Sequence, residues 1–305
     1  MKDLIIIGGG AAGITAGIYA ARKYIDALLI TSDFTGQIGK SSWVENYPGL
    51  KKITGLDLIK NFKEHLDMFP LEKKAFENIE KIEKTQGGFS VVTDEGAYET
   101  RALIIASGNI PRKLNVKNED KFLGKGVSYC VTCDEAGYKG KTVAVTGGGN
   151  AGFEAAIELG RFCEKVYLLE TADALAADMI LQKEAEENNK IEIIVSVDIL
   201  SFAGAETLEK VVFINKKTQE TKELKIEGCF VEIGTCPNTD FVKGFLDLNE
   251  KGEIKVDPIN FETSVPGCFA AGDVNNLPGK QIVIACGQGA SALLSAYKYL
   301  NNNND

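Results

Sequence analysis

Short apolar runs alternate with glycine-rich turns and amphipathic stretches along most of this 305-residue chain. The apolar run Leu4–Ile7 is followed by Gly8, Gly10 and Gly13, and then by the alanine-rich stretch 11–23. A continuous apolar run before a glycine turn and a helical pattern predicts a buried parallel strand, a tight loop and a helix.

The same pattern returns in the middle of the chain. The apolar run 142–146 precedes Gly147, Gly149 and Gly152, and the helical stretch 153–162 follows. Each copy is followed by segments of alternating polarity with turn signals, at 87–108 and at 209–234. Two such copies predict two Rossmann-like halves, each with an antiparallel meander.

The C-terminal part has no counterpart in the middle of the chain. It contains an apolar stretch that ends at Asp273 and an amphipathic stretch over 280–300, which predict a strand and a helix that return to the first domain. We therefore expect an α/β protein with two Rossmann-like, three-layer ββα dinucleotide-binding domains, the second inserted in the first. The expected boundaries are 1–113 and 245–305 for the first domain and 114–244 for the insertion.

Composition and charge narrow the classes of function. The chain is 44% hydrophobic and 25% charged, with a formal net charge of −9, so general affinity for nucleic acid is excluded because that requires a basic face. No apolar stretch approaches the ~18 residues of a membrane span. We expect an unprocessed cytoplasmic protein without a membrane anchor.

Two of the seven cysteines, Cys130 and Cys133, lie two residues apart with Asp134 directly behind them, whereas the other five stand singly. A thiolate is the nucleophile of disulfide exchange, and a second thiol one helical turn away can close a disulfide. The stretch 133–138 has the pattern of a helix start, whose dipole favours a thiolate. Asp134 is then a candidate acid or base for the departing thiolate.

A zinc half-site is the alternative interpretation of the cysteine pair. Structural zinc needs about four nitrogen or sulfur ligands. The chain has one histidine, His65, and no second close cysteine pair. We therefore expect no metal.

The glycine pattern G-x-G-x-x-G lets backbone approach a pyrophosphate at a helix N-terminus. For the first copy an ordinary strand-turn-helix remains an alternative. Further stretches are specific in combination, namely 35–39 (TGQIG), 44–49 (VENYPG), 104–108 (IIASG), 130–134 (CVTCD), 234–239 (GTCPNT) and 262–274 (ETSVPGCFAAGDV).

With these motifs the chain resembles the low-molecular-weight thioredoxin reductases of bacteria and archaea over essentially its full length. The resemblance implies FAD in the first domain, a redox-active Cys130/Cys133 pair in the insertion, the acid/base role for Asp134, thioredoxin as partner and a homodimer. It implies FAD contacts from Gly8, Gly10, Gly13, Gly36, Gln37, Asn46, Ala106, Gly108, Gly272, Asp273, Lys280, Gln281 and Ile282.

The chain departs from that family where NADPH would bind. Glu170, Thr171 and Ala172 stand in place of His-Arg-Arg, and Ala176 in place of a further Arg. None of the four arginines lies beyond Glu170, so a 2′-phosphate would meet repulsion instead of a guanidinium. NADPH is a poor candidate.

Two donors remain open. An acidic residue about 20 positions after the glycine loop can accept ribose hydroxyls, so Glu170 with Gly147, Gly149 and Gly152 could bind NADH. The second site could instead be vestigial, as in a clostridial branch of the family that takes electrons from ferredoxin. Two electrons falling from about −400 mV to −270 mV release about 6 kcal/mol, and we expect ferredoxin.

Other functions stay open at this point. The chain could reduce the disulfide of a different protein partner, or it could be a redox-inactive module that only binds the flavin. Two retained thiols in one helical turn argue against an inactive module.

Overall fold

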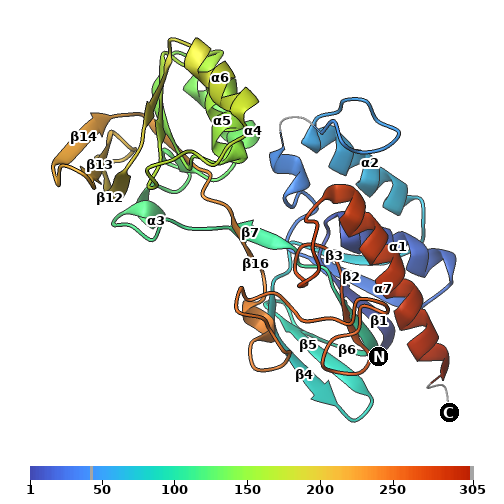
Figure 1. Ribbon diagram of the computed structural model, residues 1–305. Coiled ribbons are helices and arrows are strands. Elements are labelled where there is room, and N and C mark those ends of the chain that lie inside the picture. Colours follow the sequence, from blue (N-terminus) through green and yellow to red (C-terminus); the bar gives the residue numbers. More distant parts are fainter. Residues whose placement is uncertain (42–43, 303–305) are drawn as a thin grey trace. The chain divides into compact units, whose positions relative to one another are not determined.

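The computed structural model describes residues 1–41 and 44–302, with only the backbone at Cys133. The chain divides into two compact units (Figure 1). Unit 1 contains Met1–Ile110 and Cys236–Asp305, and unit 2 contains Pro111–Thr235. The short strands β7 (Asn109–Pro111) and β16 (Thr235–Pro237) connect the units and pair with each other.

Unit 1 begins with a strand, a glycine turn and a helix, as the apolar pattern predicts. Its elements are β1 (Lys2–Ile7), α1 (Ala11–Arg22), β2 (Ala27–Thr31), η1 (Ile38–Lys40), α2 (Gly55–Asp67), β3 (Glu72–Ala75), β4 (Ile79–Thr85), β5 (Gly88–Thr93), β6 (Ala97–Ile105), η3 (Asp240–Val242), β17 (Cys268–Ala270) and α7 (Ile282–Asn302).

The sheet of unit 1 has the order β3-β2-β1-β6-β5-β4, and β17 also pairs with β6. Strands β1, β2, β3, β6 and β17 run parallel, while β4, β5 and β6 form an antiparallel meander. Side chains alternate across β1: Leu4 and Ile6 pack with the helices, and Ile5 and Ile7 pack on the opposite face. This explains the uninterrupted apolar run, because a parallel strand covered on both faces has no polar side.

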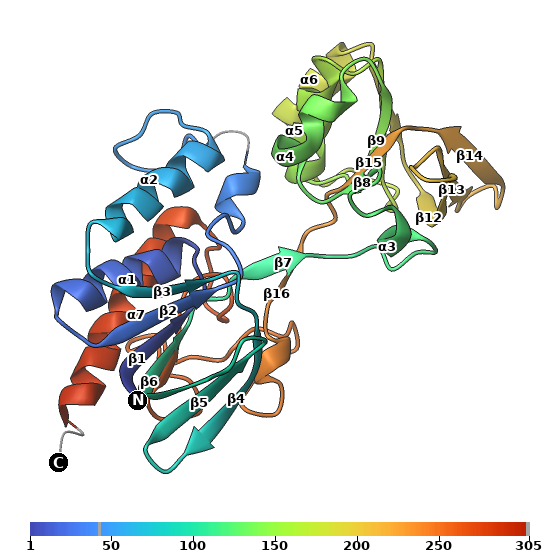
Figure 2. The same cartoon turned by 180° about the vertical axis from the view of Figure 1, so that it is seen from behind.

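The C-terminal segment completes unit 1. Strand β17 lies beside β6, and both views show α7 alongside α1 (Figures 1 and 2). The two helices approach closely at Gly289, where an added Cβ would lie 2.2 Å from the Ala12 oxygen. The strand ends at Ala270, so the expectation that it extends to Asp273 is wrong.

The return of the chain to unit 1 occurs earlier than 245. Val242, Leu246 and Ile254 are buried in the same cluster as Ile5 and Ile7 of β1. Because those apolar side chains need the sheet of unit 1 to cover them, residues 236–244 group with unit 1, whereas the sequence pattern had assigned them to the insertion.

Unit 2 repeats the plan of strand, glycine turn and helix, and again places a meander after it. Its elements are α3 (Glu119–Phe122), β8 (Val127–Ser128), α4 (Val131–Asp134), η2 (Glu135–Tyr138), β9 (Thr142–Thr146), α5 (Asn150–Gly160), β10 (Lys165–Leu169), α6 (Met179–Glu187), β11 (Ile191–Ile194), β12 (Val197–Ala203), β13 (Lys210–Asn215), β14 (Thr221–Lys225) and β15 (Gly228–Val231).

The parallel sheet of unit 2 has the order β11-β10-β9-β15-β8, and β12-β13-β14 form a separate antiparallel sheet. Val143 and Val145 of β9 pack in the cluster that contains Phe153 of α5. Ala144, between them, packs in the cluster that contains Phe202 and Val211 of the meander. Each unit therefore has three layers, and the expected fold class is confirmed.

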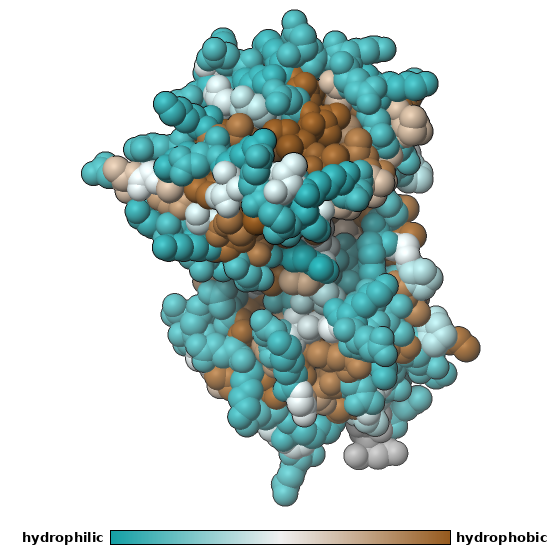
Figure 3. Space-filling model, turned by 60° about the vertical axis from the view of Figure 1, so that its left-hand side comes forward, coloured by the Kyte–Doolittle hydropathy of each residue, from teal (hydrophilic) through white to brown (hydrophobic). Residues whose placement is uncertain are grey.

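The surface is mainly hydrophilic on the face drawn in Figure 3, with hydrophobic areas between the hydrophilic groups. Among the helices of residues 1–41 and 44–302, none has the length and apolar character needed to cross a membrane.

Candidate active site

The cysteine pair follows the shortest strand of unit 2. Strand β8 ends at Ser128, Cys130 occupies the N-cap position of α4, and the backbone continues through α4 into the 3₁₀ turn η2. The helix starts at Val131, so the expected helix start at Cys133 is wrong. With four residues, α4 has only a small macrodipole, because that dipole is a sum over aligned peptide units.

Cys130 is disulfide-bonded and only 9% exposed. The side chain of Cys133 lies outside the described part of the structure. The five other cysteines are free. Burial raises the pKa of Cys163 to about 11 and of Cys268 to about 12, and it raises the pKa of Cys229 as well, so these three stay protonated thiols at neutral pH.

Asp134 is tied to the segment before the cysteines through a buried hydroxyl. Ser128 Oγ donates to Asp134 Oδ2 at 2.6 Å and accepts from the backbone N–H of Cys130 at 3.0 Å. One hydroxyl thus connects the candidate acid/base with the residue that carries the disulfide. Ser128 was not among the predicted site residues, although a small polar residue in a buried strand was a visible signal.

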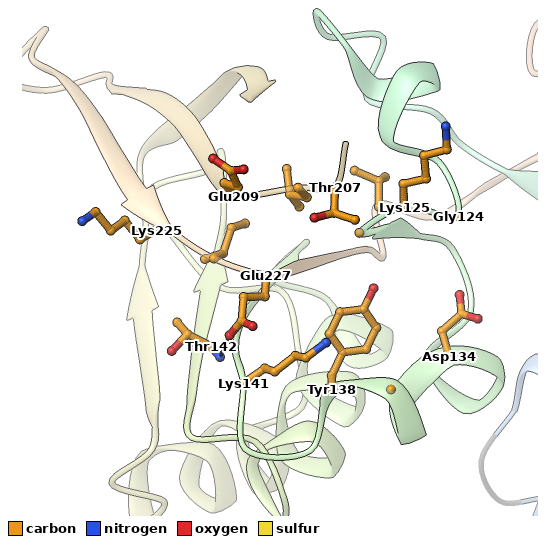
Figure 4. A pocket seen from close by; sticks show the side chains of 15 residues that line it. Gly124, Lys125, Asp134, Tyr138, Lys141, Thr142, Thr207, Glu209, Lys225 and Glu227 are labelled. Carbon is orange, nitrogen blue, oxygen red and sulfur yellow. Dashed lines mark hydrogen bonds between the residues drawn. The ribbon is translucent and has the colours of Figure 1, made fainter. Parts of the chain in front are cut away.

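A cavity of about 670 Å³ lies beside Asp134 within unit 2 (Figure 4). Figure 4 shows Tyr138 between Lys141 and Asp134, with its hydroxyl pointing into the open space. The Tyr138 ring packs edge-on against Phe230 at 5.1 Å between ring centres. Burial raises the pKa of Tyr138, and the charge of Asp134 raises it further. The cavity lies at the start of β9 and therefore at the opposite end of that strand from the glycine loop.

A second carboxyl follows Asp134 directly. Burial raises the pKa of Glu135, and the charge of Glu158 together with a hydrogen bond to it raises the pKa further, while Arg161 opposes the shift. Among the described residues no group of three or more His, Cys, Asp or Glu side chains is arranged to hold a metal ion.

The first glycine loop has the close contacts that only glycine permits. Gly8 has φ +113°, and a Cβ there would lie 2.2 Å from the Ala106 oxygen. A Cβ on Gly13 would lie 1.9 Å from the Gly8 oxygen, whereas one on Gly10 would meet nothing within 4 Å. The turn and the helix are thus in contact, and the space in front of Gly10 at the N-terminus of α1 is open to a pyrophosphate.

Other residues of unit 1 that were expected to contact FAD form two hydrogen bonds or adopt positive φ angles. Gln37 Nε2 donates to the backbone oxygen of Asn109 at 2.8 Å, and Asn46 Nδ2 donates to Gln281 Oε1 at 3.1 Å. Gly36 and Gly108 have positive φ angles of +52° and +63°. The two hydrogen bonds join residues that are 72 and 235 positions apart in the chain.

Asp273, Lys280 and Gln281 lie in the segment that precedes α7. Burial raises the pKa of Asp273, and the charge of Lys280 opposes this shift. No group in the described parts of the chain donates a hydrogen bond to the Asp273 carboxylate. Lys280 instead pairs with Glu253 at 3.1 Å. Lys280 and Gln281 precede the helix, whose first residue is Ile282.

A buried polar pair beside Gly272 was also absent from the predicted site. Gln288 Oε1 accepts from the Gly272 N–H and from Asn275 Nδ2, both at 2.8 Å. Both side chains are buried. The sequence signal for this pair was the polar Gln288 among the apolar residues of the C-terminal helix. Gln288 fixes the turn that carries Asp273.

The second glycine loop repeats the backbone of the first. Gly147 has φ +119°, and a Cβ on Gly152 would lie 1.8 Å from the Gly147 oxygen, while Gly149 has nothing within 4 Å of a Cβ. Glu170 is hydrogen-bonded to this loop, because its Oε2 accepts the Gly148 N–H and its Oε1 accepts the Ala172 N–H at 2.7 Å.

The segment after Glu170 folds back onto the same loop. The N–H groups of Ala176 and Ala177 donate to the Gly148 oxygen at 2.9 and 3.1 Å. Asp178 and Asn150 exchange two hydrogen bonds, with the Asp178 carboxylate accepting from Asn150 Nδ2 at 3.0 Å at the start of α5. A carboxylate thus lies beside the helix end at which a dinucleotide phosphate would bind.

Two known proteins are similar in sequence to almost the whole of this chain. A 34.2 kDa protein in the rubredoxin operon of Clostridium pasteurianum is 38% identical over 299 residues, which cover 98% of this chain and 97% of that protein. An alkyl hydroperoxide reductase subunit of Staphylococcus aureus is 37% identical over 302 residues, 99% of this chain. The chain spans 59% of the length of that relative.

Solved structures show the same architecture. A thioredoxin reductase of Lactococcus lactis matches with a TM-score of 0.90 and 33% identity, covering 99% of this chain and 100% of the other. A ferredoxin-flavin thioredoxin reductase of Clostridium acetobutylicum matches with a TM-score of 0.54 and 30% identity, covering 99% of each chain. The model of the pyridine nucleotide-disulphide oxidoreductases matches residues 2–289. The chain therefore belongs to the pyridine nucleotide-disulphide oxidoreductase family, whose members bind FAD.

Proposed function

We propose that this protein is a thioredoxin-disulfide reductase that passes electrons from FAD through the Cys130/Cys133 dithiol to thioredoxin, with reduced ferredoxin as the donor. The observation that carries the donor assignment is the Glu170 carboxylate, which is hydrogen-bonded into the second glycine loop. In this proposal the loop is a structural remnant of a dinucleotide site.

The residues of unit 1 fit FAD. The open space at Gly10 suits the pyrophosphate, and the half-buried Asp273 carboxylate, which has no donor among the described residues, suits a ribityl hydroxyl. Gly36, Gln37, Asn46, Lys280, Gln281 and Ile282 would complete the site, together with the backbone at Ala106 and Gly108. When bound, FAD supplies two electrons to the disulfide and accepts electrons from the donor.

The thiols carry out the exchange with the partner. A thiolate of the pair attacks one sulfur of the oxidised partner, forms a mixed disulfide and releases the partner's other sulfur as a thiolate. The second cysteine then attacks its neighbour, closes the Cys130–Cys133 disulfide and releases the reduced partner. Asp134 takes the proton of the second thiol and delivers it to the departing thiolate.

The second glycine loop argues against a pyridine nucleotide. Both oxygens of Glu170 accept backbone N–H groups, and one of these belongs to the loop itself. A phosphate at the start of α5 would also lie near the Asp178 carboxylate, and the chain has no arginine beyond position 170 to offset that charge. The repulsion between like charges disfavours NADPH in particular, because its 2′-phosphate adds further negative charge.

NADH is the second candidate donor. A carboxylate oxygen that accepts one N–H retains a lone pair, so Glu170 can still accept a ribose hydroxyl. The disulfide partner also has an alternative, because the chain is 37% identical to the staphylococcal alkyl hydroperoxide reductase subunit over 302 residues. A peroxidase disulfide would then replace thioredoxin.

Anaerobic reduction of the flavin tests the donor. The holoenzyme is titrated in parallel with NADPH, NADH and reduced ferredoxin while the flavin absorbance is recorded, and oxidised thioredoxin is then added. We expect bleaching by ferredoxin alone and reoxidation by thioredoxin. Rapid bleaching by micromolar NADH with no response to ferredoxin would contradict the donor assignment, and a reduced flavin that thioredoxin leaves unchanged would contradict the partner.

A further inference from the structure

We propose that Ser128 is a positioning residue for Asp134 and supports its carboxyl group in both protonation states of the exchange. The proposal rests on the proposed function, in which Asp134 takes up and releases a proton in each cycle.

Three contacts converge on the Ser128 hydroxyl. Its oxygen lies 2.6 Å from Asp134 Oδ2, 3.0 Å from the backbone nitrogen of Cys130 and 3.2 Å from the backbone oxygen of Cys130. Ser128 is 5% exposed, so water does not compete freely for these contacts. Strand β8 pairs with β15 and holds this residue through the parallel sheet.

A hydroxyl has one proton and two lone pairs. It can therefore donate to the Asp134 carboxylate or to the Cys130 carbonyl oxygen, and not to both at once. The shorter contact, to a charged acceptor, is the stronger when Asp134 is ionised. The Cys130 N–H occupies one lone pair in either case and fixes the oxygen in place.

The same contacts suit protonated Asp134. The carboxylic acid then donates to the free lone pair of Ser128 Oγ, and the hydroxyl proton turns to the Cys130 carbonyl oxygen at 3.2 Å. No heavy atom has to move between the two states, and the Ser128 hydroxyl and the Asp134 carboxyl group remain hydrogen-bonded to each other in both. Ser128 thus allows Asp134 to change its charge without leaving either of these two groups unsatisfied, which would be costly.

Asp134 is one of the residues that line the cavity (Figure 4). Ser128 holds the carboxyl group through Oδ2. When the acid proton passes to the partner's departing sulfur, it leaves its hydrogen bond to Ser128 Oγ, and the Ser128 hydroxyl proton turns back from the Cys130 carbonyl oxygen to the carboxylate. Protons balance in this step, because Asp134 passes on the proton that it took from the second thiol of the pair.

Single-turnover kinetics test this role without a choice of donor. The holoenzyme is photoreduced with deazaflavin and EDTA, then mixed with oxidised thioredoxin, or with 5,5′-dithiobis(2-nitrobenzoate) as a small disulfide, and flavin reoxidation is followed by stopped flow. The variants are Ser128→Ala, Ser128→Thr, Asp134→Asn and the double variant Ser128→Ala/Asp134→Asn.

We expect Ser128→Ala to slow reoxidation about tenfold, as for the loss of a hydrogen bond to a charged group, and Ser128→Thr to restore most of the rate. In the Asp134→Asn background, Ser128→Ala should change the rate by less than about twofold, because the two residues act as one unit. The matched control is Ser196→Ala, which removes a buried serine hydroxyl bonded to Asp173 in the same unit at 2.5 Å. It should keep the wild-type rate.

Three outcomes would overturn the proposal. These are a wild-type rate in Ser128→Ala, a tenfold effect that persists in the Asp134→Asn background, and a melting temperature or FAD content of Ser128→Ala well below that of Ser196→Ala, which would assign Ser128 a structural role. Failure of the proposed function looks different, because wild-type enzyme would then reduce the small disulfide and leave thioredoxin oxidised.

Discussion

Two glycines of the first loop should respond in different ways to an added methyl group. In Gly13→Ala the new Cβ would lie 1.9 Å from the Gly8 oxygen, where ordinary contacts begin at 3.4 Å. In Gly10→Ala the Cβ would meet no atom within 4 Å, and the backbone angles of φ −84° and ψ −169° suit alanine. The first change affects the fold, and the second affects the space that we assign to FAD.

The expected magnitudes follow from these distances. For Gly13→Ala the turn and helix α1 must separate by about 1.5 Å, and overpacking of this kind costs about 1–3 kcal/mol, offset by about 1 kcal/mol of alanine helix propensity. We expect a net loss of about 1 kcal/mol, and at most about 2 kcal/mol, with a melting temperature lower by a few degrees. For Gly10→Ala the loss of a glycine N-cap costs about 0.5–1 kcal/mol, whereas FAD affinity should fall at least about tenfold, or 1.4 kcal/mol.

The assay uses apoprotein from which FAD has been removed. Urea unfolding reports the stability of each variant, and quenching of flavin fluorescence on titration reports FAD affinity. Gly96→Ala is the control, since a Cβ there also meets nothing within 4 Å and Gly96 is remote in sequence from the loop. Wild-type FAD affinity in Gly10→Ala, or a Gly13→Ala protein as stable as Gly96→Ala, would refute the interpretation of this loop as the FAD cradle.

Three further predictions concern the Cys130/Cys133 pair, the Glu135 carboxyl group and the second glycine loop. Cys130→Ser should keep the bound FAD spectrum and lose thioredoxin reduction by several orders of magnitude; turnover at the wild-type rate would exclude the dithiol relay. Because the pKa of Glu135 is raised, its charge opposes folding at neutral pH and this cost vanishes below the ordinary glutamate pKa of about 4.3. Glu135→Gln should therefore melt higher than wild type at pH 7.5 and equally at pH 4, and an advantage that grows toward low pH would contradict the sign. The last variant replaces Glu170, Thr171, Ala172 and Ala176 by His, Arg, Arg and Arg. We expect no flavin reduction by NADPH in this variant, because a remnant loop does not admit a dinucleotide. Flavin reduction by NADPH would show that the second loop still binds one.

Local pattern was sufficient to predict the first strand, the glycine turn and the first helix of the plan that is repeated in the two units. The runs at Leu4–Ile7 and 142–146 correspond to β1 and β9, because a strand covered on both faces shows as a continuous apolar run in any sequence. The three glycines of each loop are also local signals, since the contact that excludes a Cβ at the third glycine is made within the same turn. The return of the C-terminal strand and helix followed from the missing partner for them in the middle of the chain.

Boundaries were harder to predict, because burial by a distant element decides them. The stretch 236–244 has the pattern of a continued insertion, yet Val242 in this stretch packs against the sheet of unit 1. The helix at the cysteine pair begins at Val131 and not at Cys133, and β17 ends at Ala270 and not at Asp273. In each case the local pattern indicated the type of element but did not determine the residue at which it begins or ends.

The sequence by itself determined the two glycine loops, the close cysteine pair and the absence of arginines beyond Glu170, since these depend only on residue identity and spacing. Only the tertiary structure decided what the side chains contact. It placed Gln288 against Gly272, Asn46 against Gln281, Ser128 between Cys130 and Asp134, and the Glu170 carboxylate on the Gly148 N–H. The physical reason is that a hydrogen bond depends on distances of about 3 Å and on direction, and residues far apart in the chain reach such distances only when the sheets and helices between them have packed.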